Sequence, residues 1–115
     1  MRSEEEKLAA IEKERRRLAG KYSKIEKKRK AVMDGLFYRA AFMRVQLEEL
    51  EEDLTANGVT EEFSQGDQPP YMRERPEARI YNNLNGGYQK IIKQLTDALP
   101  KDEPVKPPAD PFEEF

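Results

Sequence analysis

The sequence contains no cysteine and no histidine. The lack of cysteine excludes disulfides and thiolate chemistry, and the lack of histidine removes both the imidazole base and the commonest zinc ligand. A catalytic site would have to be built from carboxylates and lysines, and no convergent set of acid, base and nucleophile is visible. We therefore expect a protein that is not an enzyme and that binds neither a cofactor nor a metal.

Long hydrophobic runs are also missing, since no stretch approaches the roughly 20 residues that span a bilayer. The acidic residues Glu4, Glu5 and Glu6 near the N-terminus are not the pattern of a signal peptide. We expect a soluble, intracellular protein without a membrane partner. The chain has 115 residues, of which 37% are hydrophobic and 38% charged, so it can barely bury its own core and a homo-oligomer is expected.

The net charge of −2 conceals a segregation of charge along the chain. Residues 1–30 contain 12 Lys or Arg against 6 Asp or Glu, a net charge of +6. Residues 31–58 contain 2 against 6, a net charge of −4, and residues 101–115 contain 2 against 5, a net charge of −3. This segregation predicts one end that faces a polyanion and a separate acidic tail.

Two helices are predicted in residues 1–57. Ser3 followed by Glu6 has the spacing of a capping box, which satisfies free amide donors at a helix start. Gly20 is a suitable end for this first helix. The same spacing recurs at Ser23 and Glu26, so the second helix is predicted to begin there.

The second helix is predicted to run to Asn57, where the following glycine favours a helix end, with a bend near Gly35. One continuous helix over residues 4–57 is the alternative. Apolar residues from Leu8 to Leu36 also follow a single heptad track, as in a coiled coil. Gly20 and Gly35 favour the two-helix interpretation because glycine is a poor choice inside a helix.

Residues 58–75 contain Gly58, Gly66 and two adjacent prolines and show neither helical nor strand periodicity, which predicts an irregular connection. Pro76 suits the first position of a third helix, because its missing N–H would have no partner there. Apolar residues in this segment return every three or four positions without a break across Gly86 and Gly87. A continuous helix is therefore predicted there in preference to a hairpin or a phosphate loop, with a local kink as the alternative.

The predicted fold class is therefore all-α. It comprises two N-terminal helices, or one long bent helix, an irregular loop, a third amphipathic helix over residues 76–100 and a proline-rich acidic tail over residues 101–115, which is predicted to be disordered. The helices carry more apolar surface than one chain is expected to bury. An oligomeric helical assembly follows.

Nine basic residues between positions 15 and 30 form the first candidate site, because they could neutralise several DNA phosphates in a salt-sensitive manner. They are Arg15, Arg16, Arg17, Lys21, Lys24, Lys27, Lys28, Arg29 and Lys30. The alternative is that they cover a solvated helix surface and pair with Glu12, Glu14 and Glu26. No base-reading motif accompanies them, so sequence preference is expected to be weak or to come from DNA shape.

Two acidic segments are further candidates. The carboxylates between Glu48 and Asp53 could bind Mg²⁺, but their positions fan out over the polar side of a helix, so a solvated face is expected. Phe112 and Phe115 lie among acids in the tail and could form a short docking peptide for a partner protein. An ordinary disordered tail is the alternative.

Five short segments carry a family resemblance over residues 36–100. They read AAFMRVQLEEL at 40–50, NG at 57–58, FSQG at 63–66, RERPEARIYN at 73–82 and IKQLTDALP at 92–100. In this order they resemble small phage proteins of the terminase small-subunit family. The resemblance departs at Gly86 and Gly87, where ordinary helix-formers are expected, and no N-terminal helix-turn-helix is evident.

The resemblance implies a DNA-packaging protein that forms a ring, binds double-stranded viral DNA and regulates the large terminase subunit, in the host cytoplasm. The predicted core and subunit interfaces would consist of Leu36, Phe37, Phe42, Met43, Leu47, Leu50, Tyr81, Leu84, Tyr88, Ile91 and Leu95. The competing hypothesis is a structural coiled-coil or scaffold protein whose basic residues pair only between subunits and never contact nucleic acid.

Overall fold

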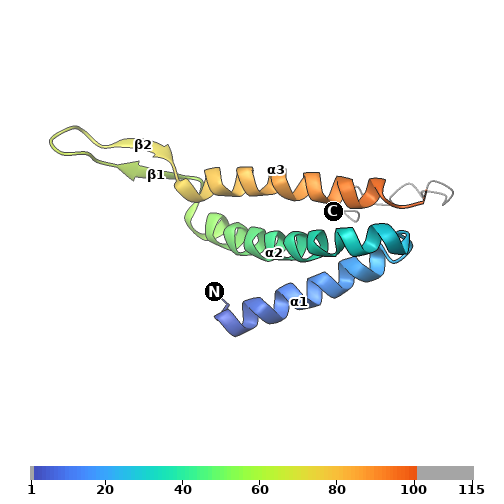
Figure 1. The fold of residues 1–115 in the computed structure, drawn as a ribbon. Helices are drawn as coiled ribbons and strands as arrows, with labels where there is room; N and C mark the ends of the chain where they lie inside the picture. The colour runs from blue at the N-terminus through green and yellow to red at the C-terminus, as the bar shows by residue number, and fades with distance from the viewer. Residues whose placement is uncertain (1, 101–115) are drawn as a thin grey trace.

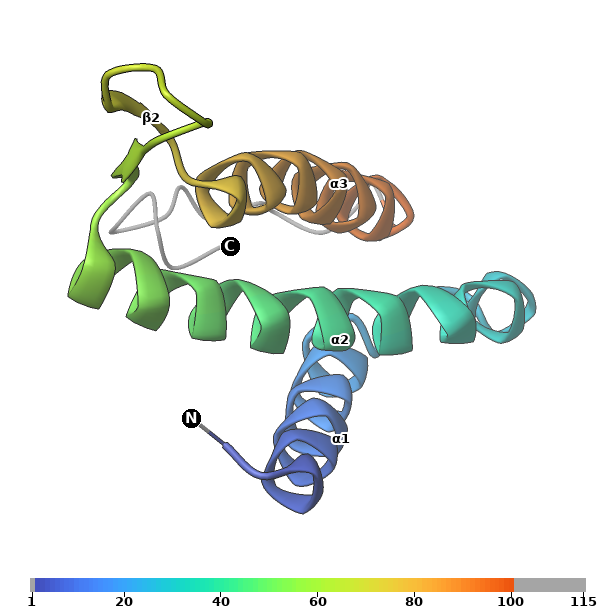
Figure 2. The same cartoon turned by 90° about the vertical axis from the view of Figure 1, so that its left-hand side faces the viewer.

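The computed structural model describes residues 2–100, which form three helices and one β-hairpin. The helices α1 (Glu4–Lys21), α2 (Lys27–Asn57) and α3 (Pro76–Asp97) run antiparallel to one another in chain order (Figure 1). The middle helix is α2, and both views place α1 and α3 on opposite sides of it (Figures 1 and 2). The molecule is elongated, with extents of 63 × 32 × 25 Å. No helix in this part of the chain is long and apolar enough to cross a membrane.

The structure confirms two separate N-terminal helices. The capping box of α1 is formed as predicted, since the Glu6 amide donates to the Ser3 hydroxyl oxygen at 3.2 Å. The cap predicted at Ser23 is wrong. Instead, α2 begins after Glu26, which makes no side-chain cap bond. The residues before it form a tight turn, which buries the side chains of Tyr22 and Ile25 between the helices and leaves no helical geometry for Ser23 to cap.

The bend expected in α2 is visible in Figure 2, where its first turns are seen almost end-on and the later turns from the side. An added Cβ atom at Gly35 would meet only the Arg39 guanidinium at 3.9 Å. The glycine therefore relieves no close packing. The weak helix propensity of glycine is the physical reason for expecting a bend at this position.

The irregular connection predicted between α2 and α3 is wrong. The structure instead contains an antiparallel hairpin of β1 (Thr60–Phe63) and β2 (Tyr71–Glu74). The all-α prediction is incomplete for the same reason. Strands of four residues are too short to give a periodic signal in the sequence. The hairpin is stabilised by contacts between side chains on its two strands. The rings of Phe63 and Tyr71 meet edge to face with centroids 5.7 Å apart, and the Arg73 guanidinium lies 3.7 Å from the centre of the Phe63 ring.

The third helix begins with Pro76 in its first turn and continues through both glycines, as predicted. An added Cβ atom at Gly87 would lie 3.5 Å from the Met43 methyl of α2, an ordinary contact, and one at Gly86 would meet nothing. The glycine pair is therefore not needed for close approach of the helices. The helix ends at Asp97, three residues before Pro100.

The hydrophobic core lies on both sides of α2, where it faces α1 and α3. Of the residues predicted for core and interfaces, Phe37, Leu47, Tyr88 and Leu95 are buried within the single chain. A second group is half-buried, namely Leu36, Met43, Leu50, Tyr81, Leu84 and Ile91. The remaining residue, Phe42, is 41% exposed. Most of this apolar surface is thus covered inside one chain, and subunit contacts through it stay a prediction.

Candidate functional site

One end of the bundle collects most of the predicted basic site. Here α1 ends, α2 begins and α3 ends (Figure 1). We call this the basic end and define it as Lys21, Lys24, Lys27, Lys28, Arg29 and Lys30. All are exposed except Lys30, which is half-buried, and with Glu26 as the one acid between positions 21 and 30 the net charge is +5. Exposed cations that lie this close together in the chain can bind several neighbouring phosphates of a nucleic acid at the same time.

The three consecutive arginines of α1 are placed differently, because each already holds a carboxylate. Arg15 donates two hydrogen bonds of 2.9 and 2.7 Å to the Glu12 carboxylate, and Arg16 donates one of 3.1 Å to the same group. Arg17 holds Glu14 through bonds of 2.7 and 2.8 Å. The alternative of pairing along the helix is confirmed for these three residues. A phosphate would have to displace a bidentate carboxylate from two of them.

Glu14 also connects the helices. Its carboxylate lies 3.7 Å from the Arg44 Nε of α2, and an Arg44 Nη donates to the Tyr88 hydroxyl of α3 at 3.5 Å. The Glu14 side chain is 13% exposed, so its ion pairs are shielded from solvent on one side. The hydrogen bond to Glu14 raises the pKa of Arg17 above its ordinary value. Arg17 therefore belongs to the structural network of the bundle as well as to its surface.

The Glu12 carboxylate of α1 has a strongly shifted pKa. Hydrogen bonding from Arg15, assisted by Arg16, lowers the pKa of Glu12 from 4.5 to about 2. A lowered folded-state pKa means that the interaction stabilises α1 above pH 4.5 and is lost as the pH falls toward 2. Glu12→Gln should remove this part of the acid sensitivity. The acid sensitivity is measured as the change in the midpoint temperature of unfolding between pH 5 and pH 2, with unfolding followed by helix ellipticity.

The control for this experiment is Glu5→Gln, an exposed residue in the first turn of the same helix. The Glu12→Gln variant should be less stable than the parent at pH 5, and the difference should shrink toward pH 2 and at high salt, since exposed pairs are screened. Parallel pH curves for the parent and Glu12→Gln would show that the pair does not contribute.

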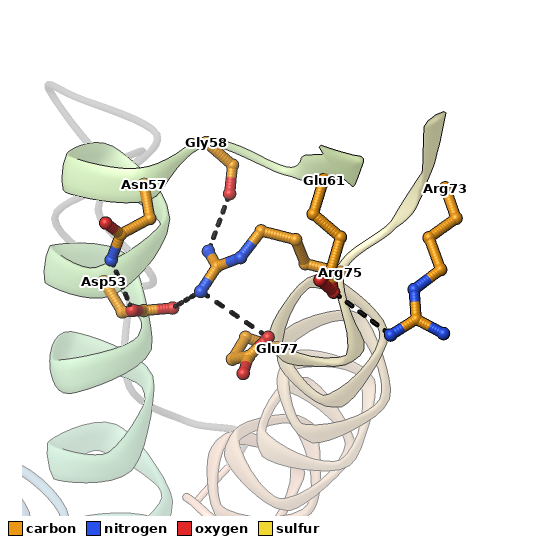
Figure 3. Close-up of polar contacts among 7 residues, drawn as sticks. All are labelled: Asp53, Asn57, Gly58, Glu61, Arg73, Arg75 and Glu77. Atoms are coloured by element: carbon orange, nitrogen blue, oxygen red, sulfur yellow. Dashed lines mark hydrogen bonds and ion pairs between the residues drawn. The ribbon is translucent and has the colours of Figure 1, made fainter. Parts of the chain in front are cut away.

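The opposite end of the bundle carries the hairpin, whose base is fixed by Arg75 (Figure 3). The two terminal nitrogens of this arginine donate to the Gly58 carbonyl at 2.8 Å and to the Asp53 carboxylate at 2.9 Å. A second carboxylate, from Glu77, lies 3.6 Å away. Asn57 donates to the other oxygen of Asp53 at 2.8 Å. The Arg75 side chain is only 13% exposed, so this junction ties α2, the hairpin and α3 together.

The acidic run of α2 is largely engaged in contacts with other elements rather than freely solvated. Glu48 faces Arg2 at 3.7 Å and Glu49 faces Lys7 at 3.1 Å, which joins α2 to the N-terminal part of the chain. Glu51 accepts a hydrogen bond of 2.9 Å from the Tyr81 hydroxyl, and this bond raises the pKa of Tyr81. Among residues 2–100 no group of three or more acidic side chains is arranged to hold a metal ion.

An open groove of about 430 Å³ lies between α2 and α3 next to this run. Its polar lining includes Arg44, Glu51, Tyr81 and Tyr88. Both tyrosine hydroxyls are occupied, one by Glu51 and the other by Arg44. The groove thus presents an internal hydrogen-bond network and not a reactive group directed at a ligand.

Comparison with known proteins gives no relative. No family model, curated protein or solved structure matches this chain. The resemblance to terminase small subunits therefore stays a prediction from the sequence motifs. The docking peptide predicted around Phe112 and Phe115 lies outside the residues that the structure describes.

The Arg75 junction is the feature that sequence analysis missed. The hairpin itself gives little signal, because exposed and half-buried positions alternate in β1 but β2 has only Arg73 half-buried. Gly66 lies between the two strands in the left-handed conformation, with φ of 59°. A glycine between two short segments is compatible with a hairpin, but two four-residue strands give too few positions to decide it.

Proposed function

We propose that this chain is a non-enzymatic DNA-packaging protein similar to terminase small subunits. In this proposal it forms a closed multimer, binds double-stranded viral DNA and regulates the large terminase subunit. The observation that carries the DNA-binding part is the basic end, where six cations with a local net charge of +5 gather at one tip of the bundle. The segments that resemble the family supply the packaging context.

The basic end is the better candidate for DNA than the arginines at 15–17. Exposed cations such as Lys21 and Lys27 can reach phosphates at little structural cost, whereas Arg15 and Arg17 would first have to release Glu12 and Glu14. The acidic run and the hairpin lie toward the other end of the molecule. Phosphate backbone is therefore attracted to one end and repelled from the other, which would orient the protein on DNA.

Neutralising the basic end should weaken DNA binding more than neutralising the arginine run. We expect Lys21→Gln, Lys27→Gln and Arg29→Gln together to reduce the slope of log affinity against log salt by about 2.7, if all three residues contact phosphate. The matched control replaces Arg15, Arg16 and Arg17 by Gln, which removes the same charge from paired positions. The measurement is fluorescence anisotropy of a labelled duplex titrated at several salt concentrations.

Two outcomes would count against this assignment. If the parent protein does not bind the duplex even at low salt, the DNA-binding part of the proposal fails. If the arginine variant loses more affinity than the basic-end variant, DNA contacts α1, and the ion pairs with Glu12 and Glu14 must open on binding. Circular dichroism of each variant establishes that the helices are intact.

A structural scaffold protein is the second candidate function, and the pairing of Arg15, Arg16 and Arg17 with glutamates favours it. In that case the charges of α1 stabilise the bundle and never meet nucleic acid. The scaffold hypothesis predicts assembly that is indifferent to DNA. Mass measured by light scattering with and without a duplex, at low and high salt, separates the two functions.

A further inference from the structure

One face of α2 is left uncovered by the other two helices. Lys28, Val32, Gly35, Arg39 and Phe42 follow one another at spacings of four and three residues, so they share one face of the helix, and all are exposed. Val32 is 82% exposed and Phe42 is 41% exposed. We call these five residues the α2 stripe. It combines two apolar side chains with two cations and has no partner within residues 2–100.

The hairpin offers a second uncovered surface. Cross-strand partners in an antiparallel pair point to the same face, so Thr60, Glu62, Met72 and Glu74 share one face of the hairpin. All four are exposed, and Met72 is 63% exposed. We call them the outer hairpin face. The opposite face is different, because Arg73 lies over the Phe63 ring and partly covers it.

The hairpin is held in a fixed position although it projects from the helices. It extends past the start of α3 into solvent (Figure 1), and the Arg75 junction fixes its base to α2. A two-stranded hairpin alone is only marginally stable in water, and it gains stability when one face packs against another element. An arm with a fixed base and an uncovered face is suited to contact a second molecule.

We propose that the outer hairpin face of one copy docks on the α2 stripe of a second copy. The surfaces are complementary, because the acids Glu62 and Glu74 would meet the cations of the stripe, Lys28 and Arg39, while Met72 would pack against Val32. This inference rests on the self-assembly part of the proposed function and names the interface.

The two surfaces cannot meet within one chain. Phe42 lies 15 residues before the end of α2 at Asn57, about 22 Å along the helix, and the hairpin points away from the bundle. Direct pairing of two α2 stripes is less favourable, because it brings the cations Lys28 and Arg39 of both copies together and leaves the hairpin face open.

The contact joins two different surfaces, so each copy can donate a hairpin to one neighbour and accept one from another. Such a head-to-tail contact repeats until it closes into a ring or extends as a filament. Lys28 belongs to both the α2 stripe and the basic end. The DNA-binding test above uses Lys21, Lys27 and Arg29 for this reason, since none of them belongs to the stripe.

The proposal is tested with one variant on each surface. Met72→Lys places a cation on the apolar contact, beside Lys28 and Arg39, and should abolish donation, whereas Val32→Glu places an acid on the same contact, beside Glu62 and Glu74, and should abolish acceptance. Each variant alone should need at least about tenfold more protein to assemble than the parent. It should have the monomer mass of 13.4 kDa where the parent forms a multimer. An equal mixture should give a species of at least twice that mass, because one intact interface joins the two variants and the introduced lysine and glutamate attract each other at the other interface.

Light scattering coupled to gel filtration, over a dilution series and without DNA, reads out these masses. Leu8→Lys is the matched control, since Leu8 is 55% exposed on α1 and belongs to neither surface, and this variant should assemble like the parent. If a charged variant loses helix ellipticity, Met72→Gln and Val32→Gln replace the pair and must give the same pattern.

Three results would overturn the proposal: a parent that stays monomeric throughout the series, a Met72→Lys variant that assembles like the parent, or an equal mixture that remains monomeric. The second result together with loss of assembly in Val32→Glu would point to direct pairing of α2 stripes. DNA binding is measured separately on the monomeric variants, so failure of this interface does not decide the DNA-binding part of the function.

Discussion

Replacing Phe37 by alanine should lower the free energy of unfolding by about 4 kcal/mol. Its side chain is 1% exposed and its ring stacks on that of Tyr22, with centroids 6.4 Å apart. Tyr22 lies in the turn after α1, and its hydroxyl is 3.0 Å from that of Thr96 in α3. Phe37 therefore fills the place where all three helices meet. Its removal leaves a cavity that rigid neighbours on three sides cannot close.

The matched control is Phe42→Ala, which changes the same residue type five positions later on the same helix. Phe42 is 41% exposed, so its loss should cost under about 1 kcal/mol in dilute, unassembled protein. Urea unfolding followed by ellipticity gives both values. Because about 4 kcal/mol approaches the whole stability of a small domain, Phe37→Leu provides a folded intermediate with an expected loss of about 1.5 kcal/mol. Equal losses for Phe37→Ala and Phe42→Ala would contradict the central position of Phe37.

Replacing Arg75 by methionine should cost about 2 kcal/mol. The long apolar side chain preserves much of the packing but removes the donors to the Gly58 carbonyl and to Asp53. Both acceptors then lose charge-assisted bonds at a site where the arginine side chain is only 13% exposed. The exposed fraction of Asp53, 32%, keeps the loss below that of a fully buried pair.

Arg79→Met is the control for this variant, since Arg79 lies one helix turn later and is exposed. It should change the free energy of unfolding by less than about 0.5 kcal/mol. Hydrogen exchange supplies a local readout, because the Arg75 amide donates to the Val59 carbonyl at the hairpin base. Arg75→Met should accelerate exchange of the hairpin amides more than that of the middle of α2. Uniform acceleration would show that Arg75 stabilises the whole bundle and does not specifically anchor the hairpin.

The helices could be predicted from the sequence because their signals extend over many residues. The capping box at Ser3, the proline at position 76 and the unbroken apolar phase across Gly86 and Gly87 each correspond to a feature of the structure. The start of α2 was misplaced at Ser23 because a capping pattern is local. Burial of Tyr22 and Ile25 by the other helices decided that turn instead.

The basic site was only partly predictable. The sequence places nine cations between residues 15 and 30 but does not show which of them pair with Glu12 and Glu14. The structure makes this distinction, because Glu12 and Glu14 lie within reach of the three arginines on the surface of α1. Residues 21–30 occupy the end of α1, a turn and the start of α2, and of the basic residues there only Lys30 is half-buried while the others are exposed.

The sequence by itself determined the helical character of the protein and the separation of its charge into a basic and an acidic part, since both follow from composition and short-range periodicity. Only the tertiary structure decided the hairpin, its Arg75 anchor and the exposed α2 stripe. Those features depend on Asp53, Gly58 and Arg75 meeting across a reversal of the chain, and on which face of α2 its two neighbours leave open. No local pattern of residues encodes either of these conditions.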